Sequence, residues 1–162
     1  SVTRPAPPPP KPARPAAFPT RGRVRIPSVA IEGPVVSTVV KDRDMVIPPN
    51  SRDVAWLDHG SYPGPYRNVI LAGHRSWGGR QGTLWRLGEV KEGDEVWVEV
   101  DGAAHGYRVK WVRLYHPDNA PVEEIMGETP VHSVTLITCG GNFDQARRRY
   151  DQRIVVRAEA LS

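Results

Sequence analysis

The chain has 162 residues, enough for one hydrophobic core, and its 39% hydrophobic and 25% charged residues are typical of a globular domain. No apolar run reaches the length of a transmembrane helix, and the single cysteine, Cys139, excludes an intrachain disulfide framework and a structural zinc finger. The net charge of +4 arises in the first 25 residues, which carry six basic residues and no acid. The remaining 16 basic and 18 acidic residues argue against a nucleic-acid-binding surface.

The first 22 residues are expected to form an extended linker. Eight of the 17 prolines lie within the first nineteen residues, and proline neither donates a backbone hydrogen bond nor continues a helix. This composition favours a polyproline-like chain outside any packed core, with an SH3-type ligand as the alternative interpretation. We therefore predict a disordered Pro-rich segment over residues 1–22 and one folded domain over residues 23–162.

From Arg23 onward, short β-branched runs alternate with glycine and proline, which indicates strands rather than amphipathic helices. The first candidate strands cover residues 24–26, 29–31 and 35–40. Residues 68–72 (NVILA) form a short apolar run of the kind found in strands that are buried on both faces. Helical turns are expected around residues 83–87 and 122–126.

A β-hairpin is predicted over residues 94–111, with Asp101-Gly102 as its turn. Apolar and polar residues alternate along the outgoing strand, so one face is expected to carry Val96, Val98 and Val100. The returning strand alternates in the same way and is expected to place on one face Tyr107, Val109 and Trp111.

Two further strands are predicted in the C-terminal part: residues 133–138 (SVTLIT), ending at Cys139, and residues 154–156 (IVV). Many short strands with one or two short helices predict an all-β fold, either a closed barrel or a sandwich. The sequence contains no Gly-rich phosphate loop, no internal repeat and no cluster of metal ligands with suitable spacing. No cofactor or metal is therefore expected.

Three reactive side chains are predicted to lie where buried strands meet loops. His74 ends the run VILAGH, Cys139 ends TLITC, and Arg153 precedes IVV. Singly, each has an ordinary interpretation: a histidine bonded to backbone, a buried thiol, or an exposed charge. A cysteine nucleophile, however, needs a partner that sets its protonation and a cation that stabilises an anionic tetrahedral intermediate. The combination of these three residues therefore favours a catalytic site.

The motifs ILAGHR, TLITC and RIVV resemble, in the same chain order, the histidine, cysteine and arginine motifs of sortases, the cysteine transpeptidases of Gram-positive cell surfaces. The resemblance covers residues 23–158, and the stretch CGGNFD is most similar to class F sortases of actinobacteria. Class F members carry a Tyr-Arg-Asp triplet before the last strand, whereas this chain reads YDQR over residues 150–153. We therefore assign the arginine to Arg153, with Arg149 and Arg148 as alternatives.

The resemblance implies a closed sortase-type β-barrel and cleavage of an LPxTG-type sorting signal between Thr and Gly. By this resemblance, Cys139 is the nucleophile that forms a thioester, and His74 is the general acid for the leaving amine. Arg153 would bind the substrate backbone or the oxyanion, a role that suits a bidentate and permanently charged guanidinium.

Further site residues are proposed around these three. Thr138 matches the usual threonine of the family and is expected to contact the substrate. Gly140 permits close approach of a ligand to the backbone, and Trp77, in the Gly-rich loop after His74, is expected to wall the substrate groove. Asp58 and Asp144 are candidates to orient His74, with a simple turn residue as the alternative interpretation of each.

The resemblance also implies partners and a location. The partners are sorting-signal-bearing surface proteins and an amine acceptor such as a peptidoglycan precursor, and the protein is expected to be a monomer that binds no nucleic acid. A membrane anchor is expected before this chain, which places the domain outside the cytoplasm. Two other functions remain open: a sorting-signal peptidase that uses water as acceptor, and a non-catalytic barrel that binds wall or peptide.

Overall fold

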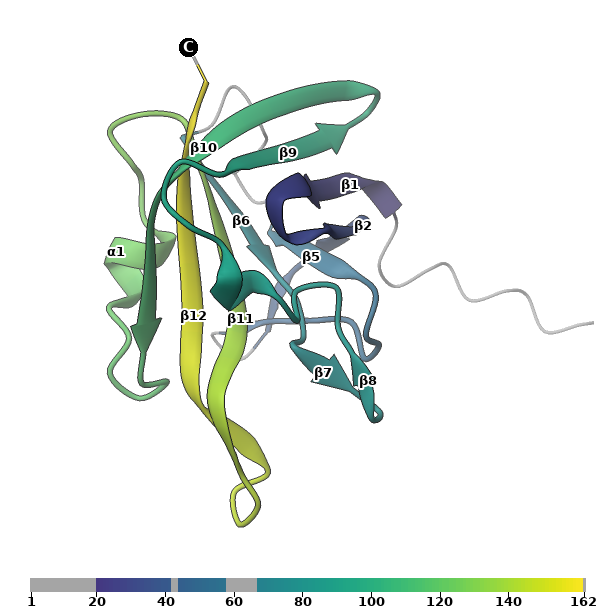
Figure 1. Cartoon of the computed structure of the whole chain (residues 1–162), viewed down its shortest axis with the longest axis vertical. Coiled ribbons are helices and arrows are strands. Elements are labelled where there is room, and N and C mark those ends of the chain that lie inside the picture. Colours follow the sequence, from purple (N-terminus) through teal and green to yellow (C-terminus); the bar gives the residue numbers. More distant parts are fainter. Residues whose placement is uncertain (1–19, 42–43, 58–66, 162) are drawn as a thin grey trace, which may run out of the picture.

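The computed structural model describes residues 20–41, 44–57 and 67–161 (Figure 1). Eight strands form the main sheet: β1 (Thr20–Ile26), β2 (Ile31–Thr38), β5 (Val54–Leu57), β6 (Asn68–Ala72), β9 (Glu95–Val100), β10 (Ala103–Tyr115), β11 (Ser133–Asp144) and β12 (Arg149–Ala160). Four short strands form two small sheets: β3 (Val40–Lys41) with β4 (Asp44–Met45), and β7 (Ser76–Trp77) with β8 (Arg80–Gln81). The helical elements are the 3-10 helices η1 (Pro27–Val29) and η2 (Leu87–Glu89) and the α-helix α1 (Val122–Met126).

The eight main strands close into a barrel in the order β1-β2-β5-β6-β11-β12-β10-β9. Two neighbouring pairs are parallel, β2 with β5 and β6 with β11, and the other pairs are antiparallel. This architecture confirms the predicted all-β closed barrel. The predicted Pro-rich segment lies almost wholly outside the described residues, and β1 begins at Thr20, three residues before the expected boundary at Arg23.

The hairpin predicted between residues 94 and 111 is present as β9 and β10. Val96, Val98 and Val100 are all fully buried in the core. Asp101 and Gly102 join the strands with φ angles of +50° and +81°, the combination that a two-residue hairpin turn requires. The alternation of the sequence therefore predicted the face and the turn of this hairpin correctly.

The returning strand β10 departs from simple alternation. Its register against β12 shifts between Val109 and Trp111, which marks a β-bulge. Tyr107 and Val109 belong to the core, but beyond the extra residue it is Val112 that packs against the core. The prediction that Trp111 shares a face with Tyr107 and Val109 is wrong, because one inserted residue exchanges the two faces of a strand.

Strands β11 and β12 are longer than predicted. Each has twelve residues, whereas the sequence indicated a strand that ends at Cys139 and another that begins at Ile154. The two strands continue to pair beyond the end of β6, with a register shift between Gly140 and Phe143, and Figure 1 shows this arm extending past the barrel. Cys139 therefore lies two residues past Ile137, the partner of the last residue of β6, and within its own strand.

Side chains from two strands hold the helix α1 against the outside of the barrel. A helix of five residues is not stable alone, so it depends on these contacts. Asn68 Nδ2 donates to the carbonyls of Ile125 and Gly127 at 3.1 and 2.7 Å, and Arg157 Nη2 donates to the carbonyl of Glu124 at 2.9 Å. The helical turn predicted over residues 122–126 is thus confirmed, and the one predicted near residues 83–87 is observed as turns that lead into η2. No helix in the described residues is long and apolar enough to cross a bilayer.

Candidate active site

Cys139 and Arg153 face each other across two neighbouring strands. They are register partners in the antiparallel pairing of β11 with β12. Arg153 Nη1 donates to Cys139 Sγ at 3.8 Å, and both side chains are partly buried. Since Leu136 and Val156 of the same strands point into the core, the alternation of side chains places Cys139 and Arg153 on the outer face of the barrel.

His74 reaches the same place from the other side of β11. In the parallel pairing of β6 with β11, Ala72 is the partner of Ile137, and His74 and Cys139 each follow two residues later. The Gly73 amide donates to the Ile137 carbonyl at 3.2 Å, which continues the parallel ladder beyond β6. Parallel strands bring their carboxyl ends to the same edge, so this register places His74 and Cys139 at neighbouring positions just past the end of β6.

Thr138 lies between these two residues but on the inner face. Its side chain is only 2% exposed, and its hydroxyl donates to the Gly73 carbonyl at 2.8 Å. That hydroxyl is engaged within the protein and joins the histidine segment to the cysteine strand. The period of two along β11 turns Thr138 away from the face of Cys139, and a contact of Thr138 with substrate stays a prediction.

Gly140, the residue after Cys139, is a glycine because of close packing. A Cβ at this position would stand 2.5 Å from Cγ1 of Ile154. Gly140 is buried, and its φ is not positive. The packing therefore explains the glycine without any ligand, and a role in substrate binding stays a prediction.

His74 is half-buried, and this burial lowers the pKa of its imidazole below the ordinary 6.5. Hydrogen bonding to the backbone of Pro48 and, more weakly, Ile47 acts in the opposite direction. His74 Nε2 is buried and has no hydrogen-bond partner among the described residues. The neutral imidazole is therefore favoured, with one nitrogen uncommitted to the described part of the protein.

Trp77 lies beside the histidine. The centroids of the two rings are 4.7 Å apart and the ring planes are inclined by 36°. Trp77 is nevertheless 44% exposed, although an indole is usually buried when packing is its only role. The ring thus offers an accessible aromatic surface next to the imidazole.

The alternative arginines lie farther along the β11–β12 arm. Arg149 is the register partner of Asp144 and forms an ion pair with Asp118 at 3.4 Å. Arg148 has a φ of +52° in the turn of the arm. Of the three arginines, Arg153 is the one that contacts Cys139.

Of the two aspartates proposed to orient His74, the structure describes only Asp144. Asp58 lies outside the described residues. Asp144 Oδ1 accepts hydrogen bonds from the backbone amides of Ala146 and Arg147 at 2.9 and 3.1 Å. These bonds stabilise the turn of the β11–β12 arm, and an orienting role of either aspartate stays a prediction.

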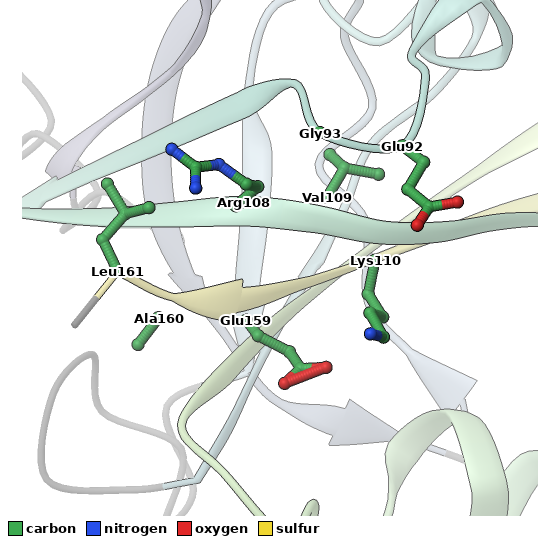
Figure 2. Close-up of a pocket in the computed structure, with 8 residues that line it drawn as sticks. All are labelled: Glu92, Gly93, Arg108, Val109, Lys110, Glu159, Ala160 and Leu161. Carbon is green, nitrogen blue, oxygen red and sulfur yellow. The ribbon is translucent and has the colours of Figure 1, made fainter.

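The described residues contain no group of three or more His, Cys, Asp or Glu side chains that could hold a metal ion. A pocket of about 320 Å³ is present elsewhere, between the turn before β9, the middle of β10 and the end of β12 (Figure 2). None of the predicted site residues lines it. The reactive groups of the candidate site are therefore a thiol, an imidazole and a guanidinium, a set that can perform nucleophilic acyl transfer.

Two contacts of this site escaped the sequence analysis. One is the backbone of Ile47 and Pro48 against His74. The other is a hydrogen bond of 2.8 Å between Ser76 Oγ and Tyr150 OH, which joins residues 74 positions apart. Contacts between residues so far apart in the sequence depend on how the loops fold over the barrel, so no local sequence pattern predicts them.

Comparison with known proteins identifies relatives of the whole folded part. A family model described as the sortase domain matches residues 24–161. Sortase A of Bacillus anthracis is 27% identical over 128 residues, which make up 78% of this chain and 55% of that protein. The chain thus spans about half the length of this curated relative.

Solved structures share the fold. A lid mutant of sortase A from Corynebacterium diphtheriae aligns with a TM-score of 0.70 at 20% identity, covering 91% of this chain and 73% of that one. Sortase C from Clostridium perfringens with the C-terminal cell wall sorting motif aligns with a TM-score of 0.69 at 22% identity, covering 89% and 71%. At these identities the likeness concerns the fold alone.

Proposed function

The chain belongs to the sortase family, and from this premise we propose that it is a cysteine transpeptidase acting on sorting signals of the LPxTG type. The observation that carries the proposal is the pairing of Cys139 with Arg153 across β11 and β12, with a 3.8 Å contact between guanidinium and sulfur. His74 follows the neighbouring strand β6. A nucleophile, a proton carrier and a fixed cation thus converge from three adjacent strands of one rigid barrel.

The first half of the proposed reaction is acylation. The thiolate of Cys139 attacks the threonine carbonyl carbon of the signal, and the carbonyl electron pair moves to oxygen. Arg153 stabilises the oxyanion or holds the adjacent substrate backbone with its positively charged guanidinium. When the Thr–Gly bond breaks, protonated His74 gives its proton to the glycine nitrogen, and a thioester on Cys139 remains.

The second half is transfer to an amine. The acceptor amine attacks the thioester carbonyl and loses a proton to neutral His74. The carbon–sulfur bond breaks, and the Cys139 thiolate is regenerated beside a protonated imidazole. Protons and charges balance over the cycle, so no cofactor is needed. Because burial lowers the pKa of His74, little imidazole carries the required proton at neutral pH, and we expect a slow enzyme.

The substrate partners follow from the same proposal. One solved relative, sortase C of Clostridium perfringens, is described with a C-terminal cell wall sorting motif. We propose that this chain likewise acts on surface proteins that carry such a motif and transfers them to an amine such as that of a peptidoglycan precursor. Placement outside the cytoplasm on a membrane anchor, and membership of class F, belong to this proposal.

Trp77 is proposed to line the substrate groove, because its exposed ring stands against His74. Replacing Trp77 with alanine should raise KM about fivefold, as expected for the loss of one aromatic contact, and should change kcat by less. Steady-state kinetics with a sorting-signal peptide measures both parameters. An unchanged KM would contradict the proposal that Trp77 lines the substrate groove.

Mass spectrometry of the protein with an LPxTG peptide, with and without an amine acceptor, tests the proposed function. The wild type should cleave between Thr and Gly, carry the acyl fragment on Cys139, and yield a ligated product with the amine, whereas Cys139→Ala should do none of these. Hydrolysis without ligation would make the protein a peptidase. Absence of cleavage of both LPxTG and LAxTG peptides, together with a native thiol inert to alkylation, would leave a binding barrel instead.

A further inference from the structure

Tyr150 connects the arginine strand to the segment that carries the histidine. It lies on β12 three residues before Arg153, and its hydroxyl shares a hydrogen bond of 2.8 Å with Ser76 Oγ on β7. Ser76 follows His74 by two residues. Figure 1 shows the small β7–β8 sheet beside the arm formed by β11 and β12. One hydrogen bond thus ties two structures that flank the candidate site.

The residue between His74 and Ser76 strengthens this connection. The Arg75 guanidinium lies 5.3 Å from the centroid of the Tyr150 ring and 4.8 Å from that of Trp85. The cation is therefore in contact with two aromatic rings, an arrangement that adds cation–π attraction to the hydrogen bond. Tyr150 also packs edge-on against Phe143. The centroids of these two rings are 5.3 Å apart, and their planes are inclined by 74°.

On the chain side before His74, Gly73 is bonded to β11, and the segment after His74 needs a fastening of its own. This segment continues into the sheet of β7 and β8, two residues each. Its backbone is also held by a 2.7 Å bond from the Gly82 amide to the Arg75 carbonyl and, where it ends, by a 2.8 Å bond from the Thr83 amide to the Ser51 carbonyl. These two bonds shape the loop without joining it to β11 or β12.

We propose that Tyr150 is a positioning residue of this sortase, which holds the histidine segment in place relative to Cys139 and Arg153 through Ser76 and Arg75. The inference rests on the proposed function for its catalytic consequence. Reacting groups lose rate steeply when they are displaced by about 1 Å, and Tyr150 bonds the histidine loop to the arginine strand directly. Its contacts with Ser76, Arg75 and Phe143 give it a positioning role.

The test removes one hydroxyl at a time. Tyr150→Phe keeps the ring against Arg75 and Phe143, and Ser76→Ala deletes the other partner. Each should lower kcat about tenfold with KM changed by less than twofold, and the double variant should be no slower than either single one because both changes break the same bond. Ser76→Thr, which restores a hydroxyl, should recover most of the loss.

A second readout does not depend on turnover. With histidine labelled at ¹³Cε1, the His74 resonance, identified by its absence in His74→Gln, should shift or broaden in both single variants. The control is Ser37→Ala on β2, which also loses a serine hydroxyl that contacts an arginine, Arg21, at 3.3 Å. It should leave kcat and the resonance unchanged.

These outcomes separate the two proposals. If wild type cleaves no peptide, the proposed function fails, and the His74 resonance alone still decides whether Tyr150 positions the segment. Wild-type kcat in both single variants, or a resonance that stays unchanged in both, would overturn the positioning role. A loss of activity in Ser76→Ala that Ser76→Thr does not recover would also overturn it.

Discussion

The β9–β10 hairpin and the β11–β12 arm are both antiparallel pairs of one barrel. The sequence pattern predicts the structure of the hairpin better than that of the arm. In β9 every second residue is a fully buried valine, and the turn has the two positive φ angles that its residues favour. In the arm, pairing continues beyond the barrel, passes a register shift after Gly140, and places reactive residues on the outer face. The difference shows that burial specifies the barrel strands, whereas neighbouring elements specify the arm.

The strongest test of this contrast is a change on the outer face that leaves the core intact. Arg153→Ala should lower kcat/KM about a hundredfold to a thousandfold, the usual loss when one charge-stabilising donor is removed. Its melting temperature should stay close to that of wild type, because Arg153 lies outside the core. Peptide-cleavage kinetics and thermal unfolding measure the two effects.

Arg149→Ala is the matched control, since this arginine lies on the same arm and pairs with Asp118 at its exposed surface. It should retain activity within about threefold of wild type, because an exposed ion pair contributes little. Near-normal activity of Arg153→Ala together with a large loss in Arg149→Ala would reverse the assignment of the arginine.

The inner face of the neighbouring strand β11 should respond in the opposite way. Leu136 is fully buried and lies three residues before Cys139. Leu136→Ala should lower the free energy of unfolding by about 2–5 kcal/mol, from lost apolar burial and the cavity left behind. Below the melting temperature, the activity per active thiol should remain within about threefold, which titration of Cys139 and urea unfolding together determine. A collapse of kcat without loss of stability would contradict this separation of the two faces.

Gly140 lies where the two regions meet, so its substitution should affect both. In Gly140→Ala the new Cβ meets Ile154 at 2.5 Å, and Ile154 must move within the core. We expect a loss of about 1–3 kcal/mol in the free energy of unfolding, with a lower kcat because Cys139 immediately precedes this position. Urea unfolding measures the first effect. The double variant Gly140→Ala/Ile154→Ala lacks both Ile154 atoms that the new Cβ would meet. It should therefore lose less stability than the sum of the two single variants, whereas additive losses would show that the clash is not the cause.

The smallest expected effect concerns pH. Because burial lowers the pKa of His74 below 6.5 in the folded protein, the unfolded chain binds more protons at this residue. The free energy of unfolding should therefore decrease as the pH falls through 6.5, and this contribution should be constant at higher pH where both states are neutral. Urea unfolding between pH 5 and 8 should show the decrease in wild type and a weaker one in His74→Gln. Parallel profiles for the two proteins would contradict the prediction.

Much of the fold was predictable from local patterns. The run over residues 68–72 is a strand buried along its whole length, and the helical turn over residues 122–126 has the predicted bounds. Both depend on neighbouring residues alone. The bulge before Trp111 was not predictable, since a single extra residue leaves no mark in an alternating pattern.

The sequence by itself determined the chemistry that this protein carries: one thiol, a histidine and an arginine, each beside an apolar run that had to become a barrel strand. It also indicated their family through three short motifs in order. The tertiary structure alone decided that Cys139 pairs with Arg153, that Thr138 turns inward to Gly73, and that Tyr150 reaches Ser76. The physical reason is that hydrophobic period is a local property, whereas strand register and loop contacts arise from residues that meet only when the barrel closes.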